Sequence, residues 1–276
     1  MNTRSSGRNR TGGADALETP VRLQFEGPIA RVTLNRPESG NAIDLELARE
    51  LMRALHACEH QSNLHAVVIS GAGRLFCAGG DLKAIHAQGD AAPLYVQELL
   101  THLHESVSAI ARIPAPVIAG INGTAAGAGF ALACACDLLI AARSARFLMA
   151  YTRVGLTPDG SSTWYLPRLV GLHRALALTL LNDEVSAETL KDWGVVLEVV
   201  DDDALEHAAL ELAGRLASGS VQASAAAKRL IRSSSGRSLE SQMTMEAETL
   251  CHALLDAEAR AGLAAFNNRG NGDTAR

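Results

Sequence analysis

The chain has 276 residues, of which 47% are hydrophobic, and its formal net charge is -5. This apolar content is enough to bury a sizeable core. The mild acidic balance argues against a nucleic-acid-binding surface, which needs clustered Lys and Arg. The five cysteines show no zinc-ribbon spacing, so we interpret them as reduced thiols of a cytoplasmic protein and expect no metal site.

The ends of the chain differ from its middle. Residues 1–19 are polar and hold almost no apolar side chain, which favours a disordered tail over a signal peptide or presequence. The longest apolar region, 117–142, is interrupted by Asn122, glycines and Asp137, so it predicts a core segment and no membrane partner. We expect three parts: a tail at 1–19, an α/β core at 20–203 and a helical C-terminal region at 204–276.

The core alternates predicted strands and helices. Val21–Phe25 and Ile29–Leu34 alternate apolar and polar residues around Gly27-Pro28, which predicts a hairpin. The next predicted elements are a helix capped by Asp44 and reaching about His60, a strand at 66–70, a helix at 93–112, and strands at 117–121 and 138–142. Such alternation favours an α/β fold with parallel strands and with ligand groups on the loops that follow strands. Residues 85–94 are expected to form an irregular loop.

The last third is predicted to be mostly helical. Helices at 163–169 and 174–181 and a strand at 195–200 lead into a region without further strand patterns. Its two apolar stripes are Leu205, Ala209, Leu212 and Leu216, and then Leu239, Met243, Leu250 and Leu254. These stripes exceed what one helical layer needs to bury, so we expect self-association as a trimer or hexamer.

The segment 116–159 carries the clearest functional signal. Gly123, Gly127 and Gly129 lie between a predicted strand and a short apolar helix. Glycine lets a backbone approach a ligand closely, and a helix start presents free N–H groups and a positive dipole end. We therefore predict an oxyanion site. The next acidic residue after Asp137 is Asp159, which would be a lone carboxylate.

Two other enzyme classes fit this segment less well. The spacing of the three glycines superficially matches the nucleotide loop of short-chain dehydrogenases, but no Tyr-x-x-x-Lys motif follows it. A serine hydrolase using Ser161 or Ser162 would lack both the G-x-S-x-G motif and a histidine nearby in sequence.

Two motifs together are more specific than either glycine loop alone. They are FCAGGDL at 76–82 and NGTAAGAG at 122–129. The combination resembles the crotonase superfamily, and the resemblance runs from about Val21 to Phe266. It implies a spiral of ββα units with a C-terminal helical region, assembled as trimers or pairs of trimers. It also implies an acyl-coenzyme A substrate and no separate cofactor, because coenzyme A is part of the substrate.

The resemblance assigns roles to particular positions. In the superfamily two backbone N–H groups hold the thioester oxygen as an enolate, and the matching positions here are Ala78 and Ala128. The residues expected to contact the acyl-coenzyme A are Gly40, Ala42, Ala78, Gly80, Asp81, Leu82, Gly123, Ala128, Tyr151, Pro158 and Asp159. Arg36 and Lys83 are candidate phosphate partners, with solvated surface charges as the alternative.

The departures from the superfamily pattern bear on the reaction. Hydratases use two glutamates, and their positions fall on Ala131 and Tyr151. Hydration is disfavoured without them, because water must be deprotonated by one group while another delivers a proton. Asp159 matches an aspartate of isomerase and dehalogenase branches, and the surrounding sequence looks most like the ring-epoxide isomerases of phenylacetate catabolism, except that Ser161-Ser162 replaces a glycine pair.

The expected function is therefore that of an acyl-CoA isomerase with Asp159 as the acid–base group. Burial should raise the pKa of this aspartate from about 3.9 toward working pH. The alternatives are an enoyl-CoA hydratase, which is a lyase, and a catalytically silent acyl-CoA binding protein.

Overall fold

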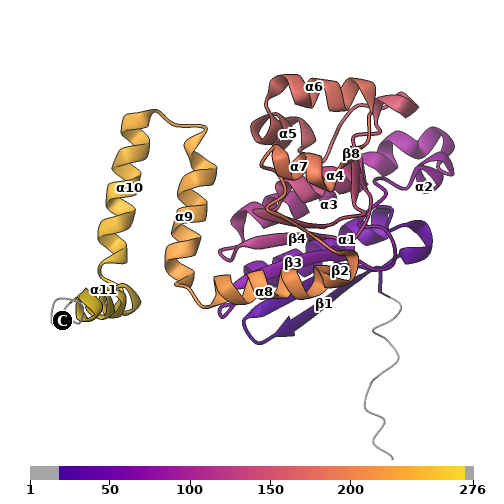
Figure 1. The fold of residues 1–276 in the computed structure, drawn as a ribbon. Helices are drawn as coiled ribbons and strands as arrows, with labels where there is room; N and C mark the ends of the chain where they lie inside the picture. The colour runs from indigo at the N-terminus through magenta and orange to yellow at the C-terminus, as the bar shows by residue number, and fades with distance from the viewer. Residues whose placement is uncertain (1–18, 271–276) are drawn as a thin grey trace, which may run out of the picture.

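A computed structural model describes residues 19–270, so most of the predicted tail lies outside the described residues (Figure 1). A six-stranded sheet has the order β1-β2-β3-β4-β6-β9, in which β1 and β2 are antiparallel and the other neighbours are parallel. Its strands are β1 (Val21–Glu26), β2 (Ile29–Leu34), β3 (Ala66–Gly71), β4 (Val117–Ile121), β6 (Leu138–Ala142) and β9 (Glu198–Val200). The predicted hairpin and the parallel α/β arrangement are confirmed.

The sequence did not predict a second, smaller sheet. It has the order β5-β7-β8, with strands β5 (Ala125–Ala126), β7 (Arg146–Leu148) and β8 (Val185–Ser186). Strands of two or three residues are too short to show a period of two.

The helices follow the predicted order closely. They are α1 (Leu45–Glu59), α2 (Leu82–His86), α3 (Ala92–Arg112), α4 (Ala128–Ala135), α5 (Ser162–Val170), α6 (Leu172–Leu181), α7 (Ala187–Asp192), α8 (Leu205–Ala217), α9 (Val221–Ser234), α10 (Leu239–Ala253) and α11 (Ala257–Gly270). The predicted cap of α1 is confirmed, since the Asp44 carboxylate accepts a hydrogen bond from the Leu47 N–H at 2.8 Å.

The predicted irregular loop at 85–94 is wrong. The segment holds the end of α2, a 3₁₀ turn (Gly89–Ala91) and the start of α3. Asp81 caps α2, because its carboxylate accepts a hydrogen bond from the Ala84 N–H at 3.0 Å. Gly89 has a positive φ of 53°, which lets the chain turn from one helix into the next.

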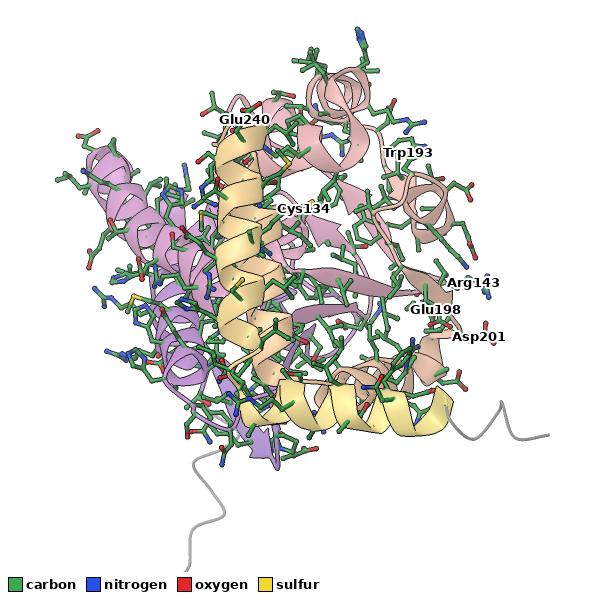
Figure 2. The ribbon with its side chains drawn as sticks, turned by 90° about the vertical axis from the view of Figure 1, so that its left-hand side faces the viewer. Cys134, Arg143, Trp193, Glu198, Asp201 and Glu240 are labelled. Carbon is green, nitrogen blue, oxygen red and sulfur yellow. The ribbon has the colours of Figure 1, made fainter. Side chains whose placement is uncertain are left out.

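The two apolar stripes of the C-terminal region have different surroundings. The first lies on α8, which packs along the sheet and buries Leu205, Ala209 and Leu212. Helices α9, α10 and α11 lie at the left of Figure 1, where α9 packs against α3 of the α/β body and against α10. Figure 2 shows α10 in front, with Glu240 near its upper end and α11 crossing below. The second stripe lies on α10 and its C-terminal end and is exposed, with Leu239 at 69% and Leu250 at 65%.

The division of the chain at residue 203 stays a prediction.

Within residues 19–270, the helices lack any stretch that is both long and apolar enough to cross a membrane.

Candidate active site

The loops that follow β3 and β4 lie against each other. The Cys77 N–H donates to the Thr124 carbonyl oxygen at 3.2 Å, and the Ala126 N–H donates to the Cys77 carbonyl oxygen at 2.9 Å. The carboxyl ends of neighbouring parallel strands meet at one edge of a sheet, so loops that follow them can meet there. The two motifs that are far apart in the sequence thus form one structural unit.

Glycines allow this close approach. A Cβ on Gly129 would lie 2.4 Å from the Cys77 carbonyl oxygen, which no side chain could tolerate. A Cβ on Gly79 would lie 2.9 Å from the Ala126 carbonyl oxygen, and Gly79 has a φ of 97°. Both positions therefore require glycine for sterics, and Gly79 also for backbone conformation.

The structure corrects one expected oxyanion donor. The Ala78 N–H donates to the Gly40 carbonyl oxygen at 2.9 Å and is therefore committed within the chain. For the Gly80 N–H, no acceptor is found among the described residues. Ala128 is the first residue of α4, so its N–H has no intrahelical acceptor and lies at the positive end of the helix dipole. The two available donors are thus those of Gly80 and Ala128.

Both donors line a cavity of about 250 Å³ that also contains Asp159, and we call it the Asp159 cavity. Of the predicted contact residues, it is lined by Ala78, Gly80, Leu82, Ala128, Tyr151 and Asp159. Its apolar side chains, apart from alanines, are Leu82, Ile85, Val96, Leu100, Met149, Val154 and Leu156. Among the residues that line it, Asp159 carries the only carboxyl group.

Asp159 is held on both its backbone and its side chain. The Ser162 N–H and hydroxyl donate to the Asp159 carbonyl oxygen at 3.0 and 2.8 Å. The Tyr151 hydroxyl donates to Asp159 Oδ1 at 2.6 Å. Burial raises the pKa of the Asp159 carboxyl group, while the Tyr151 hydrogen bond and the charge of His104 partly offset the rise. The expected direction of the pKa shift is confirmed.

The two positions expected to match the glutamates of hydratases hold groups that do not ionise near neutral pH. Burial raises the pKa of the Tyr151 hydroxyl, and the adjacent Asp159 carboxylate raises it further, so Tyr151 keeps its proton. Ala131 is 1% exposed, and a Cβ on Gly160 would lie 3.2 Å from its methyl group. Ala131 is therefore covered by the turn that carries Asp159.

The serine pair after Gly160 has a structural explanation. Ser161 adopts a φ of 71°, the left-handed conformation that favours glycine. The Ser162 hydroxyl is committed to the Asp159 carbonyl oxygen. The Ser162 contacts hold the turn that carries Asp159 against the start of α5 and do not favour a serine nucleophile.

Five predicted contact residues lie outside the lining of the Asp159 cavity, and they are Gly40, Ala42, Asp81, Gly123 and Pro158. Gly123 was expected to contact the substrate because it lies in the glycine turn. Its lack of a side chain instead lets the backbone pack closely against Arg74. A Cβ there would lie 1.9 Å from the Arg74 carbonyl oxygen.

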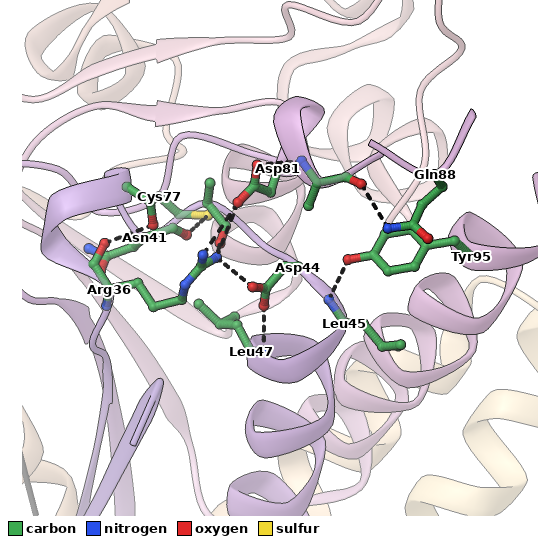
Figure 3. Close-up of polar contacts among 12 residues, drawn as sticks. Arg36, Asn41, Asp44, Leu45, Leu47, Cys77, Asp81, Gln88 and Tyr95 are labelled. Carbon is green, nitrogen blue, oxygen red and sulfur yellow. Dashed lines mark hydrogen bonds and ion pairs between the residues drawn. The ribbon is translucent and has the colours of Figure 1, made fainter. Parts of the chain in front are cut away.

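Arg36 is engaged inside the chain (Figure 3). Its guanidinium donates to the Ala42 carbonyl oxygen at 2.6 Å and forms ion pairs with Asp44 at 3.0 Å and Asp81 at 3.4 Å. These contacts favour a structural role for Arg36 and Asp81 over direct binding of phosphate. Lys83 is exposed on α2, next to the cavity residue Leu82.

Sequence reasoning missed most of the apolar lining. Val96 and Leu100 project into the cavity from α3 at a spacing of four residues, and His104 follows at the same spacing. That spacing places all three on one face of the helix. The pattern was visible in the sequence, but nothing in it showed which face of α3 meets the glycine loops.

Comparisons with known proteins identify the family. A family model described as enoyl-CoA hydratase/isomerase matches residues 24–273. The 1,2-epoxyphenylacetyl-CoA isomerase of Escherichia coli (strain K12) is 38% identical over 243 residues, which cover 87% of this chain and 92% of that protein. The 4-chlorobenzoyl coenzyme A dehalogenase-2 of an Arthrobacter species is 33% identical over 223 residues, or 80% of each chain.

A solved structure shows the same fold. The crystal structure of an enoyl-CoA hydratase from Polaromonas sp. JS666 superimposes with a TM-score of 0.87 at 36% identity, covering 90% of this chain and 97% of that one. The expected crotonase fold is thereby confirmed. The names of these relatives include an isomerase, a dehalogenase and a hydratase, so they define a family and leave the reaction open. The chain belongs to the enoyl-CoA hydratase/isomerase family.

Proposed function

We propose that the protein is an acyl-CoA isomerase that works through a thioester enolate. The thioester oxygen accepts hydrogen bonds from the Gly80 and Ala128 N–H groups. Asp159 removes a proton from the carbon next to the thioester carbonyl, and the electron pair moves into the enolate. Asp159 then returns this proton at the γ-carbon of an unsaturated acyl chain, which shifts the double bond without gain or loss of atoms.

The proposal depends chiefly on the single carboxyl group beside two available N–H donors. Each such donor, aimed at a developing oxyanion, contributes about 3 kcal/mol in known enzymes. One carboxylate is sufficient to carry one proton between two carbons of an enolate. Syn-addition of water calls for a second acid–base group, and the Tyr151 hydroxyl, with its raised pKa, is poorly suited to that task.

The lining of the Asp159 cavity favours a thioester whose acyl group is apolar. Apart from Asp159, the Tyr151 hydroxyl and Thr157, the side chains around the cavity are apolar. The name of the Escherichia coli relative supports aryl-acetyl thioesters as one candidate class. Lys83 is our candidate for a coenzyme A phosphate partner, because it is exposed beside Leu82.

The substitution Asp159→Asn tests the proposal. It keeps the shape of the side chain and an acceptor for Tyr151, so thioester binding measured by calorimetry should stay within about twofold. Turnover should fall by roughly 100- to 10,000-fold, the usual loss for a general acid–base group. The control Asp90→Asn makes the same chemical change on an exposed residue outside the cavity and should leave turnover unchanged.

Two results would overturn the proposal. Full isomerase activity in Asp159→Asn would mean that another group carries the proton. Efficient hydration of crotonyl-CoA by the wild-type protein would favour the lyase alternative.

A further inference from the structure

The two oxygens of the Asp159 carboxylate have different surroundings. Oδ1 accepts the hydrogen bond from the Tyr151 hydroxyl at 2.6 Å. No described residue donates a hydrogen bond to Oδ2. Among the described residues, Asn182 Oδ1 is the one buried polar side-chain atom without a partner, so Oδ2 of Asp159 is not fully buried. Since Asp159 lines the cavity, Oδ2 is the oxygen that remains open to it.

Tyr151 is fixed firmly at this place. Its carbonyl oxygen accepts hydrogen bonds from the N–H groups of Val154 and Leu156, both at 3.1 Å. Its ring carbons lie 3.8 Å from where a Cβ on Gly127 would be, so the ring abuts the residue that precedes Ala128. The side chain is 8% exposed, which leaves little room for another rotamer.

The backbone before Tyr151 is strained. Ala150 adopts a φ of 58°, and the Tyr151 N–H donates to the Met149 carbonyl oxygen at 2.8 Å across it. Alanine is unfavourable in this left-handed region, so the conformation persists because its surroundings impose it. The tight turn directs the tyrosine ring toward Asp159.

We propose that Tyr151 is a positioning residue that occupies Oδ1 of Asp159 and leaves Oδ2 as the one oxygen that exchanges the proton with substrate. This inference rests on the function proposed above. A carboxylate held by one oxygen cannot rotate to interchange its two oxygens, so the reactive oxygen keeps a fixed distance to the substrate carbon. The hydroxyl also stabilises the ionised carboxylate, which is the form that accepts the proton.

Two titratable groups face the Tyr151–Asp159 pair. His104, from α3, acts on Asp159, and Cys77, from the first glycine loop, faces Tyr151. Burial raises the pKa of Cys77 to about 12, so its thiol stays neutral at working pH. His104→Gln is therefore the variant that separates the effect of the histidine charge from that of the hydroxyl.

The test is Tyr151→Phe, which removes the hydroxyl alone. We expect kcat to fall about tenfold with KM changed less than about twofold, because the residue acts on the proton-transferring group and leaves the binding groups in place. The acid limb of the pH–rate profile should move to higher pH, since the carboxylate loses the hydrogen bond that favours its ionised form.

Controls separate this role from a structural one. Tyr95→Phe removes another hydrogen-bonded hydroxyl, the one that accepts from the Leu45 N–H, and should leave the pH profile in place. Adding Tyr151→Phe to Asp159→Asn should cause no further loss, because a residue that acts through Asp159 has nothing left to position.

A measurement that does not depend on turnover distinguishes the positioning role of Tyr151 from the proposed isomerase function. With the aspartate carboxyl carbons labelled with ¹³C, NMR titration of the full chain should give a higher pKa for Asp159 in Tyr151→Phe than in the wild type. An unchanged pKa and an unchanged pH profile would overturn the positioning role alone. A raised pKa in a protein whose wild type isomerises no thioester would overturn the proposed function and leave the contact intact.

Discussion

Arg232, on α9, forms two hydrogen bonds to Oδ1 of Asp137, at 2.9 and 2.7 Å, and a third to the Ala135 carbonyl oxygen at 2.7 Å. Lys228, one turn earlier, contacts Oδ2 of the same carboxylate at 2.7 Å. Ala135 is the last residue of α4, whose first residue presents the Ala128 N–H. The mostly buried Asp137 carboxylate therefore connects α9 to the C-terminal end of α4, the helix whose first residue lies in the candidate active site.

Arg232→Met should destabilise the protein by about 2 kcal/mol, because Oδ1 of Asp137 loses its charge-assisted hydrogen bonds while Lys228 still pairs with Oδ2. Urea unfolding followed by circular dichroism measures the change. The matched control is Arg229→Met on the same helix, which removes an exposed arginine and should cost less than about 0.5 kcal/mol. Equal effects of the two substitutions would contradict a stabilising role for the Asp137 cluster.

The exposed stripe on α10 predicts self-association. Leu239, Leu250 and, on α11, Phe266 are each more than half exposed, and Phe266 reaches 76%. Exposed apolar faces of this extent mark interaction surfaces, and burying them against further copies of the chain would remove them from water. Light scattering should give three or six times the chain mass of 29.0 kDa. A monomer at micromolar concentration would refute this expectation.

The oxyanion role of Ala128 can be tested with proline. Ala128 is the first residue of α4, a position where proline fits the helix, so Ala128→Pro removes the N–H while keeping the helix. Turnover should fall by roughly 100- to 1,000-fold, as when an oxyanion donor is removed.

Val221→Pro is the matched control, since it places the same ring at the start of α9, away from the cavity. It should leave turnover within about twofold of wild type. Full activity in Ala128→Pro would show that this N–H does not hold the thioester oxygen.

The raised pKa of Asp159 predicts a pH-dependent gain of stability in Asp159→Asn. Burial makes the folded protein hold this proton more tightly than the unfolded chain, so stability is lost as pH rises through the folded pKa. The asparagine variant should be more stable than the wild type at pH 7, and the gap should close as pH falls toward the unfolded pKa of about 3.9. Urea unfolding at several pH values measures it, and a gap independent of pH would contradict the raised pKa.

The sequence allowed accurate prediction of the regular elements near the site. The strands Val117–Ile121 and Leu138–Ala142 have the expected bounds, because apolar runs of five residues flanked by proline or an acidic residue are too short for a helix. The loop expected at 85–94 overlapped the end of helix α2, since five residues are too few to show a helical period.

The site was predicted in part, and the errors have physical causes. Ala78 and Gly80 lie in the same glycine loop, and only the hydrogen bond from the Ala78 N–H to Gly40 shows which of them is committed. The role of Gly123 in packing against Arg74 depends on a contact between distant segments. The Tyr151–Asp159 hydrogen bond depends on the left-handed conformation of Ala150, for which the sequence holds no signal.

Mass spectrometry of the products from a panel of thioesters tests the central claim most directly. Wild-type protein is incubated in D₂O with unsaturated acyl-CoA and aryl-acetyl-CoA substrates, with Asp159→Asn run in parallel. The account predicts a product with the same atoms as its substrate, apart from any deuterium that enters when the proton on Asp159 exchanges with D₂O before its return, in a reaction that Asp159→Asn slows. A product heavier by one molecule of water, formed at a comparable rate by both proteins, would contradict it.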